Sequence, residues 1–171
     1  GNDNSFTGVA ALAGDIRVGK LADIGSASSL GAGTTISLVN GTLAYEGEGD
    51  ASNREWLVNG VTNIIQNNGS GALDLSGALV FNVASPNPDT LTLGGSYAGT
   101  NFFSGVMSGN GNLVADSAGT WVLGGANVQR GTVTVNSGTL RAGVAGAFGN
   151  TTGLIVNGGT LDRGGFDLVA P

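Results

Sequence analysis

The sequence predicts an all-β chain wound into a parallel β-solenoid, and three observations favour this class. Short apolar or alternating segments dominate, whereas few windows carry the 3.6-residue apolar stripe of a helix. Glycine occupies 33 of the 171 positions and bounds most of these segments. Motifs also recur at imperfect spacings of roughly 20 residues, which is typical of coils stacked on one another.

Five segments show the strand pattern most clearly. Their side chains alternate or run apolar, and glycine or an Asn-Gly pair ends most of them. Because asparagine and glycine both tolerate a positive φ, the Asn-Gly pairs suit either hairpin turns or tight solenoid corners. The segments expected as strands are 35–39, 71–75, 90–93, 120–123 and 132–135, and the Asn-Gly pairs stand at 40–41, 59–60, 68–69, 110–111 and 157–158.

Internal repetition favours the solenoid over an antiparallel β-sandwich of hairpins, which stays open as the alternative. Residues 30–43 recur as 148–161, 118 positions later, with a large apolar residue and a closing leucine at matching positions. At about 20 residues per turn, residues 1–171 form a single domain of about eight coils. Gly-Thr-Leu also recurs at 41–43, 138–140 and 159–161, and Asn-x-x-x-Gly recurs at 4–8, 101–105 and 127–131.

Residues 85–89, Ser-Pro-Asn-Pro-Asp, hold two of the three prolines. A proline nitrogen cannot donate to a strand ladder, so we expect residues 85–89 to leave the coil as a protruding corner loop.

The composition excludes several classes of function. Cysteine and histidine are absent, which excludes thiolate or imidazole metal sites, a cysteine nucleophile and a Ser-His-Asp triad. Six scattered bases against twelve acids leave a net charge of −6, so we expect no DNA or RNA partner. The first residues lack the basic and apolar regions of a signal peptide, and we interpret the chain as a fragment of a longer protein.

The densest acidic stretch is the candidate interaction loop. Glu46, Glu48 and Asp50 alternate with glycine, and Arg54 and Trp56 follow shortly afterwards. Three carboxylates can bind Ca²⁺, but a single copy without a ligand pattern favours a solvated corner loop, with Arg54 as an ion-pair partner. The remaining acids stand apart, and no nucleophile–base pair is visible, so we predict no enzyme, no metal site and no cofactor.

Residues 112–140 resemble the passenger-associated transport repeat of bacterial autotransporters, the type V secreted surface proteins. The shared pattern includes Gly-Thr-Trp-x-Leu, an Asn-x-x-x-Gly and a closing Gly-Thr-Leu. Asp116 stands near the usual lysine, and Gln129 replaces the usual aromatic residue. The stretches 41–50 and 69–77 resemble another common passenger segment. The residues assigned to the structural repeat are Asn101, Gly105, Trp121, Asn127, Gly131, Gly138, Leu140, Gly159 and Leu161.

The resemblance implies a right-handed parallel β-helix that a C-terminal β-barrel translocator exports through the outer membrane. The expected location is the bacterial surface, either anchored or released by cleavage. The expected function is a scaffold or adhesin stem that assists its own secretion and meets a host-cell surface or extracellular-matrix protein. A secreted ligand of a host receptor is the alternative, and a polysaccharide-active β-helix enzyme is a weaker one.

Overall fold

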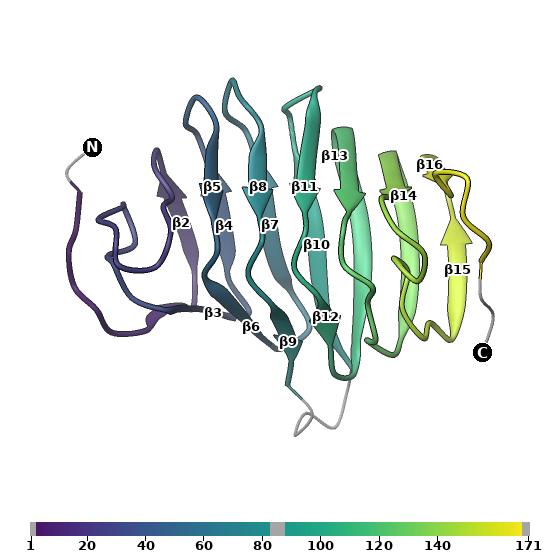
Figure 1. Ribbon diagram of the computed structural model, residues 1–171, viewed down its shortest axis with the longest axis horizontal. Helices are drawn as coiled ribbons and strands as arrows, with labels where there is room; N and C mark the ends of the chain where they lie inside the picture. The colour runs from purple at the N-terminus through teal and green to yellow at the C-terminus, as the bar shows by residue number, and fades with distance from the viewer. Residues whose placement is uncertain (1–2, 83–87, 169–171) are drawn as a thin grey trace.

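A computed structural model describes residues 3–82 and 88–168, which form sixteen β-strands and no helix (Figure 1). The strands stack side by side along one long axis, from the N-terminal turn to the C-terminal turn (Figure 1). Within these residues, no helix offers the length and apolarity that crossing a bilayer requires.

A five-stranded parallel sheet forms one wall of the solenoid, with one strand from each of its first five turns. Ile36 pairs with Ala10 on one side and with Trp56 on the other, so consecutive turns are in register. In order across the sheet the strands are β1 (Ala10–Leu12), β3 (Thr35–Val39), β6 (Glu55–Asn59), β9 (Leu79–Phe81) and β12 (Met107–Ser108).

The larger sheet bends into two limbs, each of which forms a further wall. The thirteen-residue strand β13 joins the limbs, because its first half pairs with β10 and its last four residues pair with β11. The first limb contains β2 (Asp15–Val18), β4 (Thr42–Tyr45), β7 (Asn63–Asn67) and β10 (Asp89–Gly95). The second contains β5 (Asp50–Ser52), β8 (Leu73–Leu75) and β11 (Thr100–Phe103). Beyond β13 (Gly111–Leu123), both limbs continue through β14 (Thr132–Ala142), then β15 (Gly153–Val156) and β16 (Thr160–Asp162).

All strand–strand pairings among the described residues are parallel, which confirms the β-solenoid and excludes the antiparallel sandwich. The chain makes about seven turns rather than the eight predicted. Paired residues of adjacent turns are separated by 20 residues between Ile36 and Trp56 but by 28 between Leu79 and Met107. Corner loops of unequal length therefore consume residues that the 20-residue estimate assigned to an additional turn.

The core is a continuous stack of inward side chains. One column of the first limb runs through Leu43, Ile65, Leu93, Ala115 and Val135, each on the next turn and each buried. Alternate residues of each strand point inward, so one apolar residue in two is enough to fill the interior. Burying such columns supplies the main driving force for stacking the turns.

The repeated segments 30–43 and 148–161 occupy different walls, although both consist of a strand, an Asn-Gly corner and a strand. In the first copy, β3 belongs to the five-stranded sheet and β4 to the first limb. In the second copy, β15 extends the first limb and β16 the second. The repeated sequence therefore specifies two strands and the corner between them. The register with neighbouring turns determines which wall each strand joins.

The predicted protruding loop 85–89 lies largely outside the described residues, since positions 83–87 are not described. Asp89 does not belong to a loop. It is the first residue of β10, it pairs with Gly111, and it is buried.

Candidate interaction surface

The acidic stretch forms the corner loop between β4 and β5. This loop and those between β7 and β8 and between β10 and β11 project at the same edge of the solenoid (Figure 1). Glu46 and Glu48 are exposed, and Glu46 forms an ion pair with Arg17 of the preceding turn. The loop thus presents two carboxylates at the surface, one of which is already paired.

Asp50 faces inward from this loop and has a structural role. Its Oδ2 accepts hydrogen bonds from the Tyr45 hydroxyl and the Leu21 N–H, both at 2.9 Å. The Tyr45 hydroxyl in turn accepts the Gly49 N–H at 2.9 Å. Burial, reinforced by the Asp50 carboxylate, raises the pKa of Tyr45 to about 12, although the Gly49 N–H acts in the opposite direction. Tyr45 and Asp50 therefore pin the base of the loop.

Arg54 is not an ion-pair partner of the acidic loop, in contrast to the sequence expectation. Its side chain is only 1% exposed, and its guanidinium donates to the carbonyl oxygens of Ser26, Leu30 and Gly31. Burial lowers the pKa of Arg54, while the nearby Asp23 charge works against this shift. Arg54 thus fastens the long connection after β2 to the second turn.

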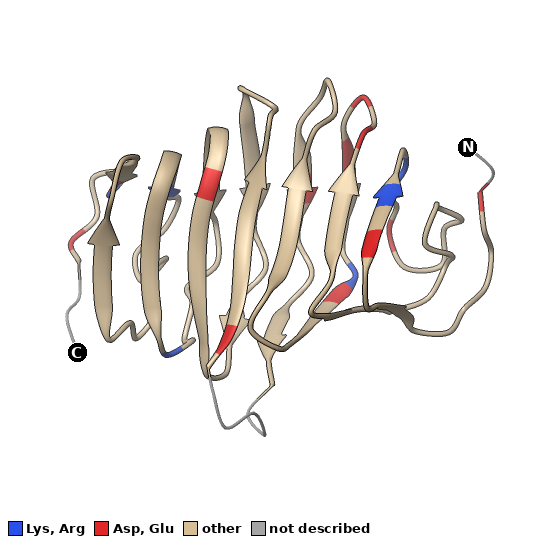
Figure 2. Cartoon of the chain, turned by 180° about the vertical axis from the view of Figure 1, so that it is seen from behind, with Lys and Arg blue, Asp and Glu red and all other residues tan. Residues whose placement is uncertain are grey.

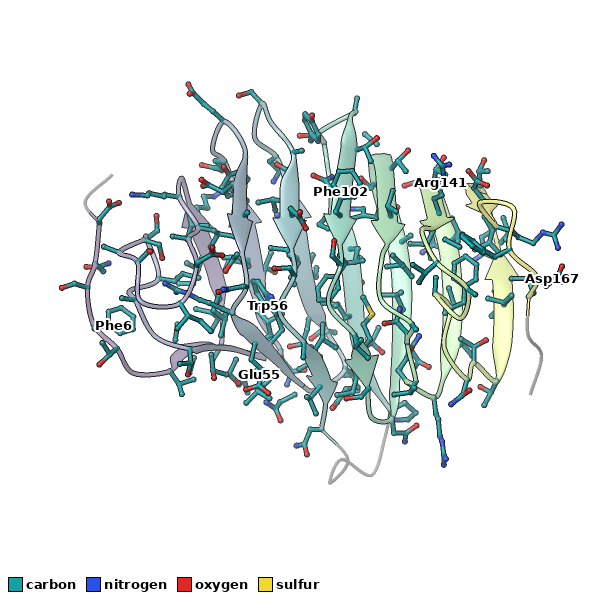
Figure 3. The ribbon with its side chains drawn as sticks, in the orientation of Figure 1. Phe6, Glu55, Trp56, Phe102, Arg141 and Asp167 are labelled. Atoms are coloured by element: carbon teal, nitrogen blue, oxygen red, sulfur yellow. The ribbon has the colours of Figure 1, made fainter. Side chains whose placement is uncertain are left out.

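Trp56 is also unavailable to a partner. It is 0% exposed, lies in β6 and points into the solenoid between Ile36 and Leu79 (Figure 3). The neighbouring Glu55 points outward. Of the five residues of the expected interaction loop, the surface therefore retains Glu46 and Glu48, with Asp50 partly covered.

The structural-repeat residues divide between the core and the corners. Asn101, Trp121, Leu140 and Leu161 form one column on four successive turns of the second limb. Asn101 Oδ1 accepts the Leu73 N–H at 3.0 Å, so its amide ties two turns together. The others are Gly105 between β11 and β12, Asn127 and Gly131 between β13 and β14, Gly138 within β14 and Gly159 before β16.

The residues that share an outer face were not identified from the sequence, because the register between turns determines which residues lie side by side. On the second limb, Phe102 is 39% exposed and lies between Asp74 and Val122 of adjacent turns. Figure 3 shows Phe102 and Arg141 along this limb. Beside them runs a ladder of threonines on successive turns: Thr100, Thr120, Thr139 and Thr160. Threonines spaced 20 or so residues apart are the sequence signal that points to such a ladder.

The charges gather toward the N-terminal turns (Figure 2). Residues 1–76 contain eight acids and three bases, whereas residues 77–171 contain four acids and three bases. Within the described ranges, no group of three or more acidic side chains is arranged to hold a metal ion. A cavity of about 330 Å³ lies at the C-terminal end, with an apolar lining that includes Val144, Phe148, Leu154 and Phe166.

Comparison with known proteins gives one clear relative. The chain is 46% identical over 171 residues to the "Adhesin BmaC autotransporter" of Brucella suis biovar 1 (strain 1330). The match covers 96% of this chain but only 5% of that relative's length. No family model and no solved structure matches the chain.

This homology indicates an exported location, at the bacterial surface or released from it. Because the chain spans one twentieth of the relative, the activity of the whole relative does not transfer directly to it. The identity along almost the entire chain and the parallel β-solenoid together confirm the resemblance drawn from the sequence: the chain is an autotransporter-type solenoid segment, homologous to a stretch of an adhesin of that family.

Proposed function

We propose that the chain is a surface-displayed segment of an adhesin passenger, which serves as a stem and meets a host-cell surface or extracellular-matrix protein. The observation that carries this proposal is the 46% identity to an autotransporter adhesin, which extends over 96% of the chain. The relative's name describes adhesion, so we favour a non-enzymatic role over a polysaccharide-active one.

The contact region we propose is the edge where the corner loops project. Glu46 and Glu48 supply exposed carboxylates there, and Phe102 supplies an exposed aromatic ring on the adjoining limb. Aromatic side chains are enriched at protein interfaces, and charged groups at the rim mainly govern association rate and specificity.

The test is a titration of the purified, labelled chain onto intact host cells and immobilised matrix proteins, at low and physiological salt. The proposal expects saturable binding that persists at physiological salt. Phe102→Ala should weaken this binding, whereas Val128→Ala, at another exposed apolar position, should not. Absence of saturable binding at either salt concentration would contradict direct adhesion and leave a stem.

We also propose that the segment assists its own export when it precedes a C-terminal β-barrel translocator. The specific support is that β13 and β14 are the longest strands and pair along much of their length. Turns that stack on their neighbours can fold stepwise as the chain emerges, which favours outward movement.

Surface yield of a passenger–translocator fusion tests this role. Trp121→Ala removes a fully buried ring from β13 and should lower the yield, while Val122→Ala on the outer face of the same strand should not. Deletion of residues 112–140 with an unchanged yield would refute the proposal.

A further inference from the structure

The outer face of the first limb carries an array of threonine and aliphatic side chains. The central column alternates between the two kinds of residue on six successive turns, and a second column runs beside it. We call these two columns the threonine–aliphatic face. The central column is Thr42, Ile64, Thr92, Val114, Thr134 and Ile155, and the second is Thr90, Asn112 and Thr132.

The polar groups of the second column bond to one another. Asn112 Oδ1 accepts the backbone N–H of Thr132 at 2.9 Å and its hydroxyl at 3.1 Å. Asn112 Nδ2 donates to the Thr90 hydroxyl at 3.5 Å, a long contact. Because unsatisfied polar groups carry most of the desolvation penalty, covering these side chains with another surface costs little.

Charge restricts what can cover the face. The five-stranded wall presents Glu55, and the second limb presents Asp74 and Asp162, whereas the threonine–aliphatic face has no charged residue of its own. On the first turn the central column continues into Asp15, which pairs with Thr42, and Arg17 lies two residues beyond it, so the uncharged face begins at Thr42. Since the chain carries a net charge of −6, a second copy is repelled least where acids are absent.

The two long edges of the face carry opposite charges. Asp116 follows the central column in β13, two residues beyond Val114, and its Oδ1 accepts the Ser137 hydroxyl at 2.6 Å. Arg130 lies on the opposite edge of the next turn, two residues before Thr132, and is exposed. Arg130 forms no ion pair with any other described residue. The two edges are about 20 Å apart, at 3.3 Å per residue along a strand.

We propose that two copies of this chain associate side by side through the threonine–aliphatic face. The two-fold axis would run parallel to the solenoid and exchange the long edges. Asp116 of each copy then faces Arg130 of the other, one turn away and within reach of the long arginine side chain. Both contacts form at once, as an isologous interface requires. This self-association goes beyond the proposed host binding and does not depend on it.

The expected interface is small. Six strands spaced about 4.8 Å apart and at most about 20 Å wide give at most roughly 500 Å² per copy, against about 800 Å² for a standard stable complex. The dimer should therefore be weak, and it should form where copies are crowded, as on a cell surface.

Sedimentation equilibrium over a wide concentration range, up to about 1 mM, tests the proposal at physiological salt. Val114→Glu should lower the association constant at least about tenfold, a change of about 1.4 kcal/mol. Val122→Glu is the matched control, because Val122 is equally half-buried in the same strand but faces outward from the second limb. A wild-type chain that stays monomeric at the highest concentration, or equal losses for both variants, would overturn the proposal.

A charge exchange tests the arrangement independently. Asp116→Arg and Arg130→Asp should each weaken association, and the double variant should restore it. The urea midpoint of each variant verifies that the fold is retained. Weakening by both single variants with no recovery in the double variant would overturn the Asp116–Arg130 contact and the two-fold axis that creates it.

Discussion

Buried polar residues hold the turns of this solenoid in register. Arg54 shows how this works, because its guanidinium bonds three carbonyl oxygens of the preceding turn while its charge is shielded from water. Arginine has five donors in a fixed fork and stays protonated, so it can satisfy several carbonyls at once. The residue that the sequence placed in an interaction loop instead stabilises the N-terminal turns.

Replacing Arg54 with methionine should therefore destabilise the fold. The side-chain volume is roughly kept, but three buried carbonyls lose their donor, and we expect a loss of about 2–5 kcal/mol in the free energy of unfolding. Urea denaturation measures this loss. Arg141→Met, which removes an exposed pair with Asp162, is the control and should cost less than about 1 kcal/mol. Equal losses for the two variants would refute the anchoring role of Arg54.

Tyr45 should make stability depend on alkaline pH. Its pKa is about 12 in the folded chain and 10.0 for the free side chain, so the folded state retains the proton that the unfolded state loses. The contribution of Tyr45 to the free energy of unfolding is fully present below pH 10 and is lost as the pH rises toward 12. Tyr45→Phe should make the loss of stability between pH 10 and 12 less steep, and Tyr97→Phe serves as the control. Thermal unfolding between pH 9 and 12 checks this, and parallel curves for the wild-type chain and Tyr45→Phe would contradict it.

At the scale of elements, corners determine how one turn joins the next. Asn127 lies between β13 and β14 and links three turns, because its Oδ1 accepts the Met107 N–H at 2.7 Å and its Nδ2 donates to the Ala147 carbonyl. A side-chain amide can make such bonds in both directions along the stack, which a hydroxyl or carboxylate cannot do equally well.

Asn127→Ala should loosen the corner and lower the free energy of unfolding by about 1–3 kcal/mol, since a buried N–H and a buried carbonyl lose their partners. Val128→Ala, at the adjacent exposed position, should have little effect. Chemical denaturation compares the two. If Val128→Ala were as damaging as Asn127→Ala, the corner would owe its stability to backbone contacts alone.

Many of the strands could be predicted from the sequence, although not their full lengths. The segment 35–39 coincides with β3, but 120–123 and 132–135 are parts of the long strands β13 and β14. Small residues at 117–119 let β13 bend between limbs without a loop, which strand patterns alone do not reveal.

The candidate site was harder to predict, although one signal was present. Trp56 and Val58 point to the same side of the alternating strand β6, and Arg54, which directly precedes this strand, continues the alternation on that side. The apolar Val58 indicates that this side faces inward. Because arginine is charged, the sequence predicted a surface position for Arg54 instead of one on this inward side. Threonines about 20 residues apart indicate an outer ladder, but the full membership of the outer columns could not be assigned from the sequence. Loops of unequal length separate the members, and only the register aligns them.

At the scale of the whole molecule, stability should vary along the axis. Each turn contacts only its neighbours, so central turns gain support from both sides and terminal turns from one. The last strand of the first limb, β15, pairs only with β14, and its inward residue Val156 is 52% exposed.

Hydrogen exchange should reflect this gradient. Amides of β7 and β10 should exchange only through large-scale opening, whereas those of β15 should exchange at least about a hundredfold faster through local fraying. Mass spectrometry of peptides from each turn provides the measurement. Uniform protection from β7 to β15 would indicate a single cooperative unit rather than a chain of coupled turns.

The stem, the adhesive edge and the side-by-side pair all depend on one register of stacked turns, which spin-label distances test most directly. With one label at Thr42 and a second at Val114, Thr134 or Ile155, the separation should grow by about 4.8 Å per turn. A steady increase in this order supports the stacked column and every surface built from it. Separations that do not grow with turn number, or a Thr42–Ile155 distance shorter than Thr42–Val114, would contradict the solenoid and the functions proposed for its faces.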